Sequence, residues 1–251
     1  MIKAPIGELV DAANAVLDWF YPPHCYHCEA PLNSAGSRIL CRSCLRALVR
    51  SRISAAVCPV CGMPHGDEPG TGALCLSCQG RRPHFHIARS VFVYAGPAGS
   101  IVRSFKFKGQ FFLGPLLMRL ATERGWLPAD VCGADYDCVV PVPLHRLRER
   151  ERGYNQALLL AEVVAREAGI PLRPRALVRR RYTGQQTRLT ADARWQNVRG
   201  AFHGAVRLEG ACVLLVDDVM STGATTSECS RALRQAGAAK VSVLTLVRAQ
   251  A

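Results

Sequence analysis

Two neighbouring carboxylates, Asp217 and Asp218, follow an apolar run at residues 213–216 and precede a Ser/Thr/Gly-rich loop at residues 221–225. A helical run, residues 227–236, comes next. Backbone N–H groups of a glycine-containing turn at a helix N-terminus attract a phosphate. The two carboxylates can accept hydrogen bonds from neighbouring hydroxyls, but they repel bare pyrophosphate. The segment therefore predicts a ligand that combines a phosphate with a diol, a metal ion or both. The alternative, a buried strand before a surface turn, leaves two carboxylates without partners, which is costly.

Eight of the twelve cysteines predict a second kind of chemistry, metal binding, because they form four C-x-x-C pairs. The pairs are Cys25/Cys28, Cys41/Cys44, Cys58/Cys61 and Cys75/Cys78. Each pair presents two thiolates on one side of a tight turn, and two pairs complete a tetrahedral site. Sequential pairing gives one site from the first four cysteines and another from the last four. A cross-braced pairing, first pair with third and second with fourth, fits the spacing too.

The metal expected in these sites is zinc, because a reducing cytoplasm disfavours disulfides and the pairs are regular. An iron–sulfur cluster, which four cysteines can also hold, is the alternative. Both sites are expected to be structural, since four protein ligands leave no open position for water. His24, His27 and His65 lie nearby but are expected to be bystanders. A segment of about 55 residues has little core of its own, so the metal is expected to supply much of its folding energy.

Composition limits the class of protein. The 251 residues are 49% hydrophobic and carry a formal net charge of +13, so a large core is possible and anionic partners are favoured. Splitting the chain at residue 90 leaves 23 of the 32 basic residues in the C-terminal part. Glu8, Asp11 and Asp18 interrupt any signal-peptide core, and no apolar run is long enough to span a membrane. Apolar residues at helical spacing predict an amphipathic segment over residues 1–24, which packs on its own protein or, alternatively, contacts a membrane. We expect a cytoplasmic protein.

The elements that must position these residues alternate between strands and helices. Apolar or alternating runs predict strands at residues 89–95, 136–142, 176–178, 213–216 and 240–247. Amphipathic runs predict helices at residues 96–108, 111–125, 155–168 and 224–236, and residues 179–199 are expected to form a long loop. This order predicts an α/β fold, a mostly parallel sheet with helices on both faces. Ligands of such sheets bind beyond the carboxyl ends of the strands, where Pro143, Asp217 and Asp218 are expected.

The acid pair and its loop closely resemble the 5-phosphoribosyl-1-pyrophosphate (PRPP) binding motif of type I phosphoribosyltransferases. The resemblance implies that Asp217 and Asp218 hold the ribose 2′ and 3′ hydroxyls. It also implies that the 5′-phosphate is held by Ser221, Thr222, Gly223, Ala224 and Thr225. Residues 140–156 follow a buried strand, where this class places its pyrophosphate loop, which implies binding by Pro143, Leu144, His145 and Arg146. Residues 183–202 take the place of the mobile catalytic loop, from which Arg194, or alternatively Arg188, closes over the substrate.

Together with the four cysteine pairs, these blocks are similar to the ComF family, whose members join a zinc-ribbon module to a phosphoribosyltransferase domain. The markers are R-G-Y-N-Q at residues 152–156 and the set Gln186, Leu189, Arg194 and Asn197. The resemblance implies a small double zinc ribbon at residues 25–80 and a type I phosphoribosyltransferase-like domain at residues 88–251. It also implies a role in natural competence, in which single-stranded DNA enters the cytoplasm during transformation.

Two activities stand as alternatives at this point. In the first, the chain binds PRPP or a related phosphorylated ribose and handles single-stranded DNA, together with other DNA-uptake or recombination proteins. The candidate nucleic-acid contacts are basic residues near aromatic ones: Lys106, Lys108, Arg148, Arg152 and Arg181. Core packing is the alternative role for the phenylalanines at 105, 107, 111 and 112.

The second activity is sugar transfer by a phosphoribosyltransferase of nucleotide salvage or metabolism. Magnesium would bridge the ribose hydroxyls and the pyrophosphate of PRPP, the acid pair would orient the ribose, and Arg146 would stabilise the departing pyrophosphate. Only a helix and a strand follow the phosphate loop, so no segment there offers an obvious nucleobase pocket. The missing acceptor pocket favours the first activity.

Overall fold

The computed structural model of the protein describes residues 23–32, 39–53, 56–65, 72–132, 134–183 and 190–249. The amphipathic segment predicted over residues 1–24 lies almost wholly outside the described residues, as do Arg188 and the markers Gln186 and Leu189. Among the described residues, no helix combines the length and apolarity that crossing a bilayer requires.

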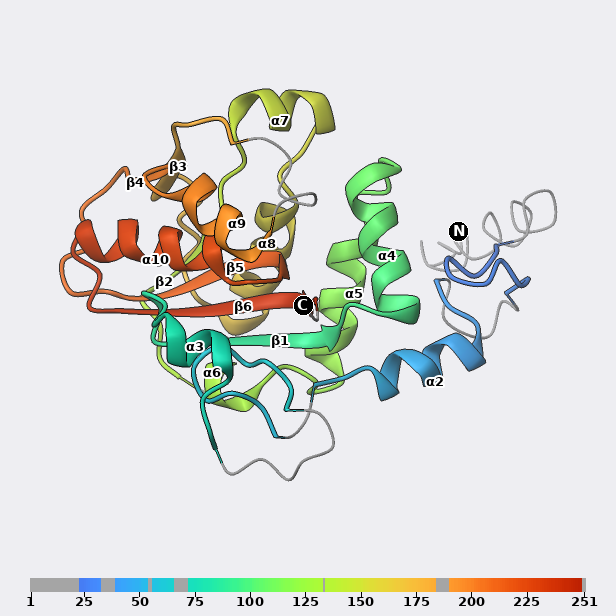
Figure 1. The fold of residues 1–251 in the computed structure, drawn as a ribbon. Helices are drawn as coiled ribbons and strands as arrows, with labels where there is room; N and C mark the ends of the chain where they lie inside the picture. The colour runs from blue at the N-terminus through green and yellow to red at the C-terminus, as the bar shows by residue number, and fades with distance from the viewer. Residues whose placement is uncertain are drawn as a thin grey trace, which may run out of the picture.

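Four parallel strands form the central sheet, in the order β1-β6-β5-β2 (Figure 1). They are β1 (Ile87–Val93), β2 (Cys138–Pro141), β5 (Cys212–Met220) and β6 (Lys240–Arg248). Successive side chains of a strand point to opposite faces of the sheet. Accordingly, Leu214 and Val216 of β5 belong to one hydrophobic core, whereas Val213 and Leu215 belong to a second. The sheet is therefore buried on both faces, as the predicted α/β fold requires.

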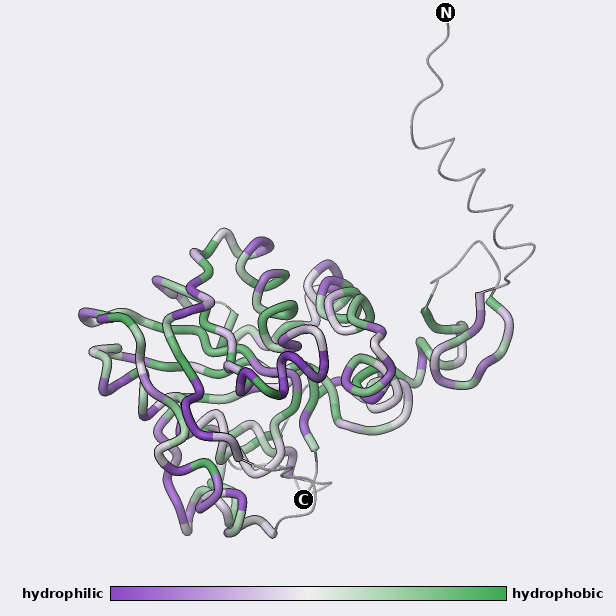
Figure 2. Tube along the Cα trace, turned by 90° about the horizontal axis from the view of Figure 1, so that it is seen from above, coloured by the Kyte–Doolittle hydropathy of each residue, from purple (hydrophilic) through white to green (hydrophobic). Residues whose placement is uncertain are grey.

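Helices cover the two faces of this sheet. The first face packs against α4 (Gly96–Phe107), α5 (Leu113–Glu123) and α8 (Gln156–Ala168), with the short α6 (Ala129–Cys132) beside β1. The second face packs against α10 (Ala224–Gln235) and an antiparallel pair, β3 (Leu177–Arg179) with β4 (Phe202–Gly204). The view from above shows the apolar residues gathered along the central strands, with polar residues at many of the outer turns (Figure 2).

The strand predicted at residues 213–216 is longer in the structure, which corrects the expected place of the acid pair. β5 continues to Met220, so Asp217 and Asp218 lie within the strand rather than beyond its end. The neighbouring β6 runs equally far and pairs with it, Asp217 opposite Thr245 and Met220 opposite Arg248. Pairing with this neighbour outweighs the low strand propensity of aspartate.

Two helices form where loops were expected. The loop predicted at residues 179–199 contains α9 (Ala191–Val198), whose first turn is capped by Thr190. The pyrophosphate-loop block contains α7 (Arg146–Arg152), which ends at Gly153 with a φ of 84°. α7 has no buried residues, and Val198 is the one fully buried residue among those of α9 whose burial the structure describes, so apolar periodicity does not reveal either helix.

The two cysteine-rich segments have the same construction. In each, a tight turn carries the first cysteine pair, and the second pair spans the start of a helix, α2 (Arg42–Arg50) or α3 (Leu76–Gly80). Cys41 and Cys75 are the N-cap residues of these helices. A helix N-terminus carries partial positive charge, which favours thiolates there. The repeat explains how two short segments with little core adopt one local structure.

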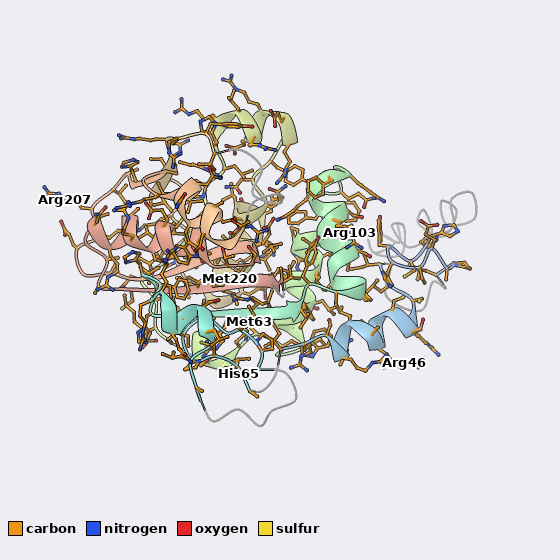
Figure 3. All side chains as sticks on the ribbon, in the orientation of Figure 1. Arg46, Met63, His65, Arg103, Arg207 and Met220 are labelled. Atoms are coloured by element: carbon orange, nitrogen blue, oxygen red, sulfur yellow. The ribbon has the colours of Figure 1, made fainter. Side chains whose placement is uncertain are left out.

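The second cysteine-rich segment packs directly on the sheet. Ala88 N–H of β1 donates to Val60 O at 2.8 Å, and the buried Arg248 of β6 donates to Cys61 O at 3.1 Å. Gly62 has a φ of 68°, and a Cβ there would lie 2.5 Å from Ala88 O, so only glycine fits this contact. Met63 of this segment packs into the core that holds Met220 of β5, and Figure 3 labels both residues. The second cysteine-rich segment is thus packed against the larger domain and shares its hydrophobic core.

Candidate ligand-binding site and metal centres

The acid pair sits where β5 lies beside the exit of β2. Pro141 pairs with Val216, and Val142 N–H donates to Val216 O at 2.9 Å. The chain that leaves β2 therefore passes directly beside Asp217. This brings the two blocks predicted to bind one ligand, residues 143–146 and residues 217–225, to the same region of the sheet.

The two carboxylates of the pair have different surroundings. Neighbouring residues of a strand point to opposite faces, so Asp218 meets residues of α4 and α7, whereas Asp217 lies on the side of α10 and β3. Asp218 is buried, with a side chain only 9% exposed, and Asp217 is half-buried. Burial, and next the negative charge of Asp218, raise the pKa of Asp217 to about 7, although the charge of Lys106 acts in the opposite direction. Asp217 can therefore exchange a proton near neutral pH.

Lys106 of α4 makes an ion pair with Asp218, with a distance of 2.9 Å between Nζ and Oδ1. The residue was predicted to contact nucleic acid, but the structure brings it to the acid pair. Its side chain is 22% exposed, so both charges of the pair are largely removed from water. The ion pair joins two sequence blocks, residues 105–109 and residues 217–218, that are separated by more than a hundred positions.

The R-G-Y-N-Q block holds Lys106 in place. Tyr154 stacks on Phe105, with 5.8 Å between ring centroids, and its hydroxyl donates to Phe105 O in the last turn of α4. Asn155 caps α8 by accepting from Ala157 N–H at 3.1 Å, and its amide donates to Val142 O at 3.1 Å. The block thus ties the end of α4 to the exit of β2. These contacts give the polar residues of the motif one shared structural role.

Arg152, the first residue of that block, also lies close to the acid pair. Its guanidinium donates to Gln156 Oε1 at 2.8 Å and lies 5.7 Å from the centre of the Phe107 ring. Burial lowers the pKa of Arg152, and the negative charge of Asp218 opposes this effect. The residue was predicted to contact nucleic acid, and its position allows it to bind the anionic part of a small ligand instead.

Arg179, at the end of β3, is a site residue that sequence reasoning missed. Burial lowers its pKa, while the charges of Cys229 and Asp217 act in the opposite direction. It donates to Thr183 and lies 5.2 Å from the centre of the Phe202 ring. The only signal in the sequence was a basic residue directly after a short strand, which is too common to identify a site.

Two buried nitrogen atoms around the pair lack partners among the described residues. They are Nε of Arg179 and Nε2 of Gln156, and Gln156 is only 2% exposed. A buried donor without an acceptor costs free energy, so it is normally satisfied by water or a ligand. Both atoms are donors, and they therefore fit a ligand that carries several acceptor oxygens.

The phosphate loop has the geometry that its sequence predicts for a helix start. Gly223 has a φ of 77° and is the N-cap of α10, so the helix begins without a side-chain cap. Thr222 Oγ1 accepts from Ala224 N–H at 3.4 Å, and Thr226 donates to Gly223 O at 3.1 Å. N–H groups of a first helical turn have no partner within the helix. The turn of Ser221, Thr222 and Gly223 is therefore suited to an anion.

The other predicted residues lie around this region. Pro143, Leu144 and His145 are half-buried at the exit of β2, and His145 caps α7 while its ring contacts Tyr182 at 5.2 Å. The remaining predicted basic residues are Arg146, Lys108, Arg148, Arg181 and Arg194. Arg146 and Lys108 are exposed, Arg148 lies 5.7 Å from the Tyr182 ring, Arg181 donates to two carbonyls at the end of α9, and Arg194 is half-buried on α9. Their ligand contacts stay predictions.

The cysteines form two clusters, and the pairing is sequential. The sulfur atoms of Cys25, Cys28, Cys41 and Cys44 all lie within 4.8 Å of one another, as do those of Cys58, Cys61, Cys75 and Cys78. The cross-braced alternative is thereby excluded. Tetrahedral zinc with Zn–S bonds of about 2.3 Å places its sulfurs roughly 3.8 Å apart, so each cluster fits one ion. His27 Nδ1 instead pairs with Ser100 of α4 at 2.9 Å, outside the clusters.

Comparisons with known proteins identify the class to which this architecture belongs. Residues 16–79 match the family described as "Double zinc ribbon domain", and residues 155–251 match "Phosphoribosyl transferase domain". The fold and site thus define a phosphoribosyltransferase-type domain that carries a double zinc ribbon.

Relatives of nearly the same length narrow the class to a family. The DNA utilization protein YhgH of Salmonella typhi is 33% identical over 228 residues, which cover 90% of this chain and 97% of that protein. Competence protein F of Haemophilus influenzae is 31% identical, and the match covers 92% of this chain and 99% of that protein. Competence protein ComFC of Bacillus subtilis is 29% identical, and the match covers 83% of this chain and 84% of that protein. The chain belongs to the ComF/YhgH family.

Proposed function

We propose that the protein binds PRPP with magnesium, or a related phosphorylated ribose, at the acid pair and acts on single-stranded DNA in the cytoplasm. The observation that carries the first part is the group of three cations, Lys106, Arg152 and Arg179, around the carboxylates of Asp217 and Asp218. Neither carboxylates alone nor cations alone suit PRPP. A ribose diol needs acceptors, whereas its phosphates need positive charge.

The proposed pose follows from these charges. The carboxylates accept hydrogen bonds from the ribose hydroxyls, and the turn of Ser221 to Gly223 receives the 5′-phosphate. Lys106 leaves Asp218 when the hydroxyls arrive and turns to the pyrophosphate, where Arg152 and the exit of β2 also contribute. A magnesium ion bound with the ligand would lie near Asp217 and Asp218, and its charge would offset that of the pyrophosphate. The unpartnered donors of Gln156 and Arg179 support this pose, because the ligand supplies acceptor oxygens.

The proposed DNA partner is supported by the names of the relatives and by the charge of the chain. The relatives are called DNA utilization and competence proteins, and this chain carries a net charge of +13. A basic surface binds the phosphates of a single strand, and the binding weakens as salt is added. Both cysteine clusters are proposed to hold structural zinc in the reducing cytoplasm.

A second candidate function is transfer of the sugar itself. One observation favours it: the pKa of Asp217 is about 7, so this carboxyl can take up the proton that an acceptor nitrogen loses. In that reaction the C1′–O bond to pyrophosphate breaks, pyrophosphate leaves with the electron pair, and the acceptor nitrogen bonds to C1′. Incubation with magnesium, PRPP and each nucleobase tests it, since only transfer predicts base-dependent release of pyrophosphate.

Gel shifts across a salt series test the DNA part of the proposal. Single-stranded and double-stranded oligonucleotides of the same length are compared at low and physiological salt. We expect retention of the single strand, with affinity that falls as salt rises. No binding of the single strand at low salt would exclude it as the partner, and equal retention of the duplex would contradict a preference for the single strand.

A further inference from the structure

A cavity of about 670 Å³ lies beside α10. Its walls come from the linker at residues 81–84, from α9 with the turn after it, and from Glu228 and Arg231 of α10. None of Lys106, Arg152, Asp217 and Asp218 lines it. The volume is within the roughly 300–1,000 Å³ typical of small-molecule sites. The cavity is therefore large enough for a ligand of its own.

The lining is strongly cationic. It contains four arginines, Arg81, Arg82, Arg199 and Arg231, together with His84, and Glu228 is the single acidic residue among the described lining residues. The carboxylate of Glu228 is already used, because Arg231 donates to both its oxygens, at 2.6 and 2.9 Å, and Gly200 N–H donates at 2.6 Å. A saturated carboxylate repels an incoming anion less than a free one does. The other cations thus face the cavity without a compensating buried acid.

Two of these cations are available to a ligand. Arg82 and Arg199 are exposed and make no side-chain hydrogen bond or ion pair with the residues that the structure describes. Arg81 reaches Asp192 only at 4.0 Å, in a pair whose two side chains are 51% and 88% exposed, and such a pair contributes little. The free charges lie on two different segments, the linker and the end of α9, so a phosphate between them would join both.

An aromatic ring completes the lining. Trp195 of α9 is half-buried, and the guanidinium of Arg81 lies 5.0 Å from the centre of its ring. Nucleobases stack on tryptophan rings and on arginine guanidinium planes. A bare phosphate would not stack on the ring, whereas a nucleotide can contact the ring with its base and the cations with its phosphate.

The cavity is linked to the phosphate loop through α10. His84 N–H donates to Ser227 Oγ at 3.0 Å, which fixes the linker to the first turns of the helix. Arg231 follows Ala224 by seven residues, a distance of roughly 10 Å along a helix. A ligand in the cavity and a phosphate at the loop would therefore contact the same helix.

We propose that this cavity binds a nucleoside phosphate, with the base against Trp195 and the phosphate between Arg82 and Arg199. The ligand is either a free mononucleotide or one unit of a single strand, and the second source rests on the proposed function. The cavity then holds a segment of DNA within reach of the helix that carries the phosphate loop.

The test follows the fluorescence of Trp195 in a chain whose other two tryptophans, Trp19 and Trp126, are replaced by Phe. The probes are a single strand of twenty thymidines, the matching duplex and dTMP. Stacking is expected to quench Trp195, and anisotropy of a labelled strand gives the affinity of each variant in the otherwise native chain. Trp195→Leu is expected to weaken binding of the strand roughly 5- to 150-fold, and Trp195→Phe to restore most of it.

Charge is tested separately from stacking. Arg199→Gln is expected to lower the slope of log affinity against log salt by about 0.7, the value for one lost contact with a single strand. Arg46→Gln is the matched control: Arg46 is exposed on α2, on the opposite side of the molecule in Figure 3, and its loss should leave the slope unchanged. The melting temperature and Mg-PRPP titration of each variant verify that the fold and the first site are intact.

The outcomes separate this cavity from the function proposed above. In one outcome the strand binds, while neither Trp195→Leu nor Arg199→Gln lowers its affinity more than Arg46→Gln does. That result would overturn the proposal for the cavity and leave DNA binding intact. If dTMP quenches Trp195 but the strand does not bind, the cavity stands as a mononucleotide site and the DNA proposal fails. Absence of both signals at low salt overturns the cavity whatever the first site binds.

Discussion

Lys106 Nζ lies 2.9 Å from Asp218 Oδ1, although the two residues come from different layers of the fold. α4 supplies the lysine from one face of the sheet, and β5 supplies the carboxylate from within it. The contact occupies an oxygen that the proposed pose assigns to a ribose hydroxyl. The ion pair is therefore the resting state of the site, and ligand binding must exchange it for another arrangement.

Lys106→Met is expected to weaken binding of Mg-PRPP at least tenfold at pH 7.5. The variant removes a charge that interacts with the pyrophosphate, and hydrogen bonds to charged groups contribute about 1.5–3 kcal/mol. Lys108→Met is the matched control, because Lys108 is exposed at the end of the same helix. Calorimetric titration measures both variants. Equal affinities for the two would show that Lys106 has no special role.

Asp217→Asn is expected to raise the melting temperature above pH 7 by several degrees. The folded pKa of Asp217 is about 7, well above the usual value of about 3.9, so the folded state holds this proton more tightly than the unfolded state does. The stability that protonated Asp217 provides is complete below pH 4 and is lost as pH rises through 7. Asparagine keeps an acceptor for Asp218 N–H and carries no charge.

A pH series of melting curves checks this expectation. One kcal/mol changes the melting temperature of a chain of this size by about 2–4 °C. The difference between variant and wild type should be smallest near pH 4 and largest at pH 8. A constant difference across this range would contradict the raised pKa of Asp217.

Gly223→Ala is expected to abolish most Mg-PRPP binding at a small cost in stability. A φ of 77° costs a non-glycine residue about 1–2 kcal/mol, and the new Cβ would lie 2.8 Å from Met220 Cε, the flexible end of a side chain. Gly169→Ala is the control, since Gly169 has a φ of 67° at the end of α8 and nothing within 4 Å of a Cβ. If the two variants lose similar stability but only Gly223→Ala loses affinity for Mg-PRPP, the loop takes part in binding. If Gly223→Ala keeps its affinity, the loop does not bind the ligand.

The two cysteine clusters should differ in their effect on the larger domain. Cys78→Ser and Cys28→Ser are each expected to reduce the metal content from two ions to one, as measured by elemental analysis. Cys78→Ser should lower the melting temperature more, because Val60 and Cys61 of its segment accept hydrogen bonds from Ala88 of β1 and Arg248 of β6, whereas Cys28 is exposed. The same loss from both variants would show that the second cluster does not support the sheet.

The sequence was sufficient for those features that depend on local patterns. Alternating and amphipathic runs located the strands of the central sheet and α4, α5, α8 and α10, and the spacing of the cysteines predicted two four-sulfur clusters. Helix α7 was missed because none of its residues is fully buried, so the helix has no apolar periodicity. The end of β5 was missed because its length is set by pairing with β6, a contact between segments that no local pattern records.

The site could be predicted only in part, for the same physical reason. Asp217, Asp218 and the loop are adjacent in the chain, so their types and spacing are visible together. Three separate elements supply the cations Lys106, Arg152 and Arg179. Their role depends on contacts with residues that are distant in the sequence. The interior position of Lys106 depends on Tyr154 and Phe105, whose contact joins α4 to the segment before α8. A basic residue between two phenylalanines looked like a surface contact for nucleic acid.

The most direct test of the account is calorimetric titration of the full chain with PRPP and magnesium. We predict saturable binding at one site by the wild type, and a loss of at least about 100-fold in affinity for the variant with Asp217→Asn and Asp218→Asn together, since two charge-assisted hydrogen bonds are weakened. A cooperative melting curve of the variant at pH 8 establishes that it is folded. Undiminished binding by this variant, or no binding by the wild type, would contradict the assignment of the acid pair to a phosphorylated ribose.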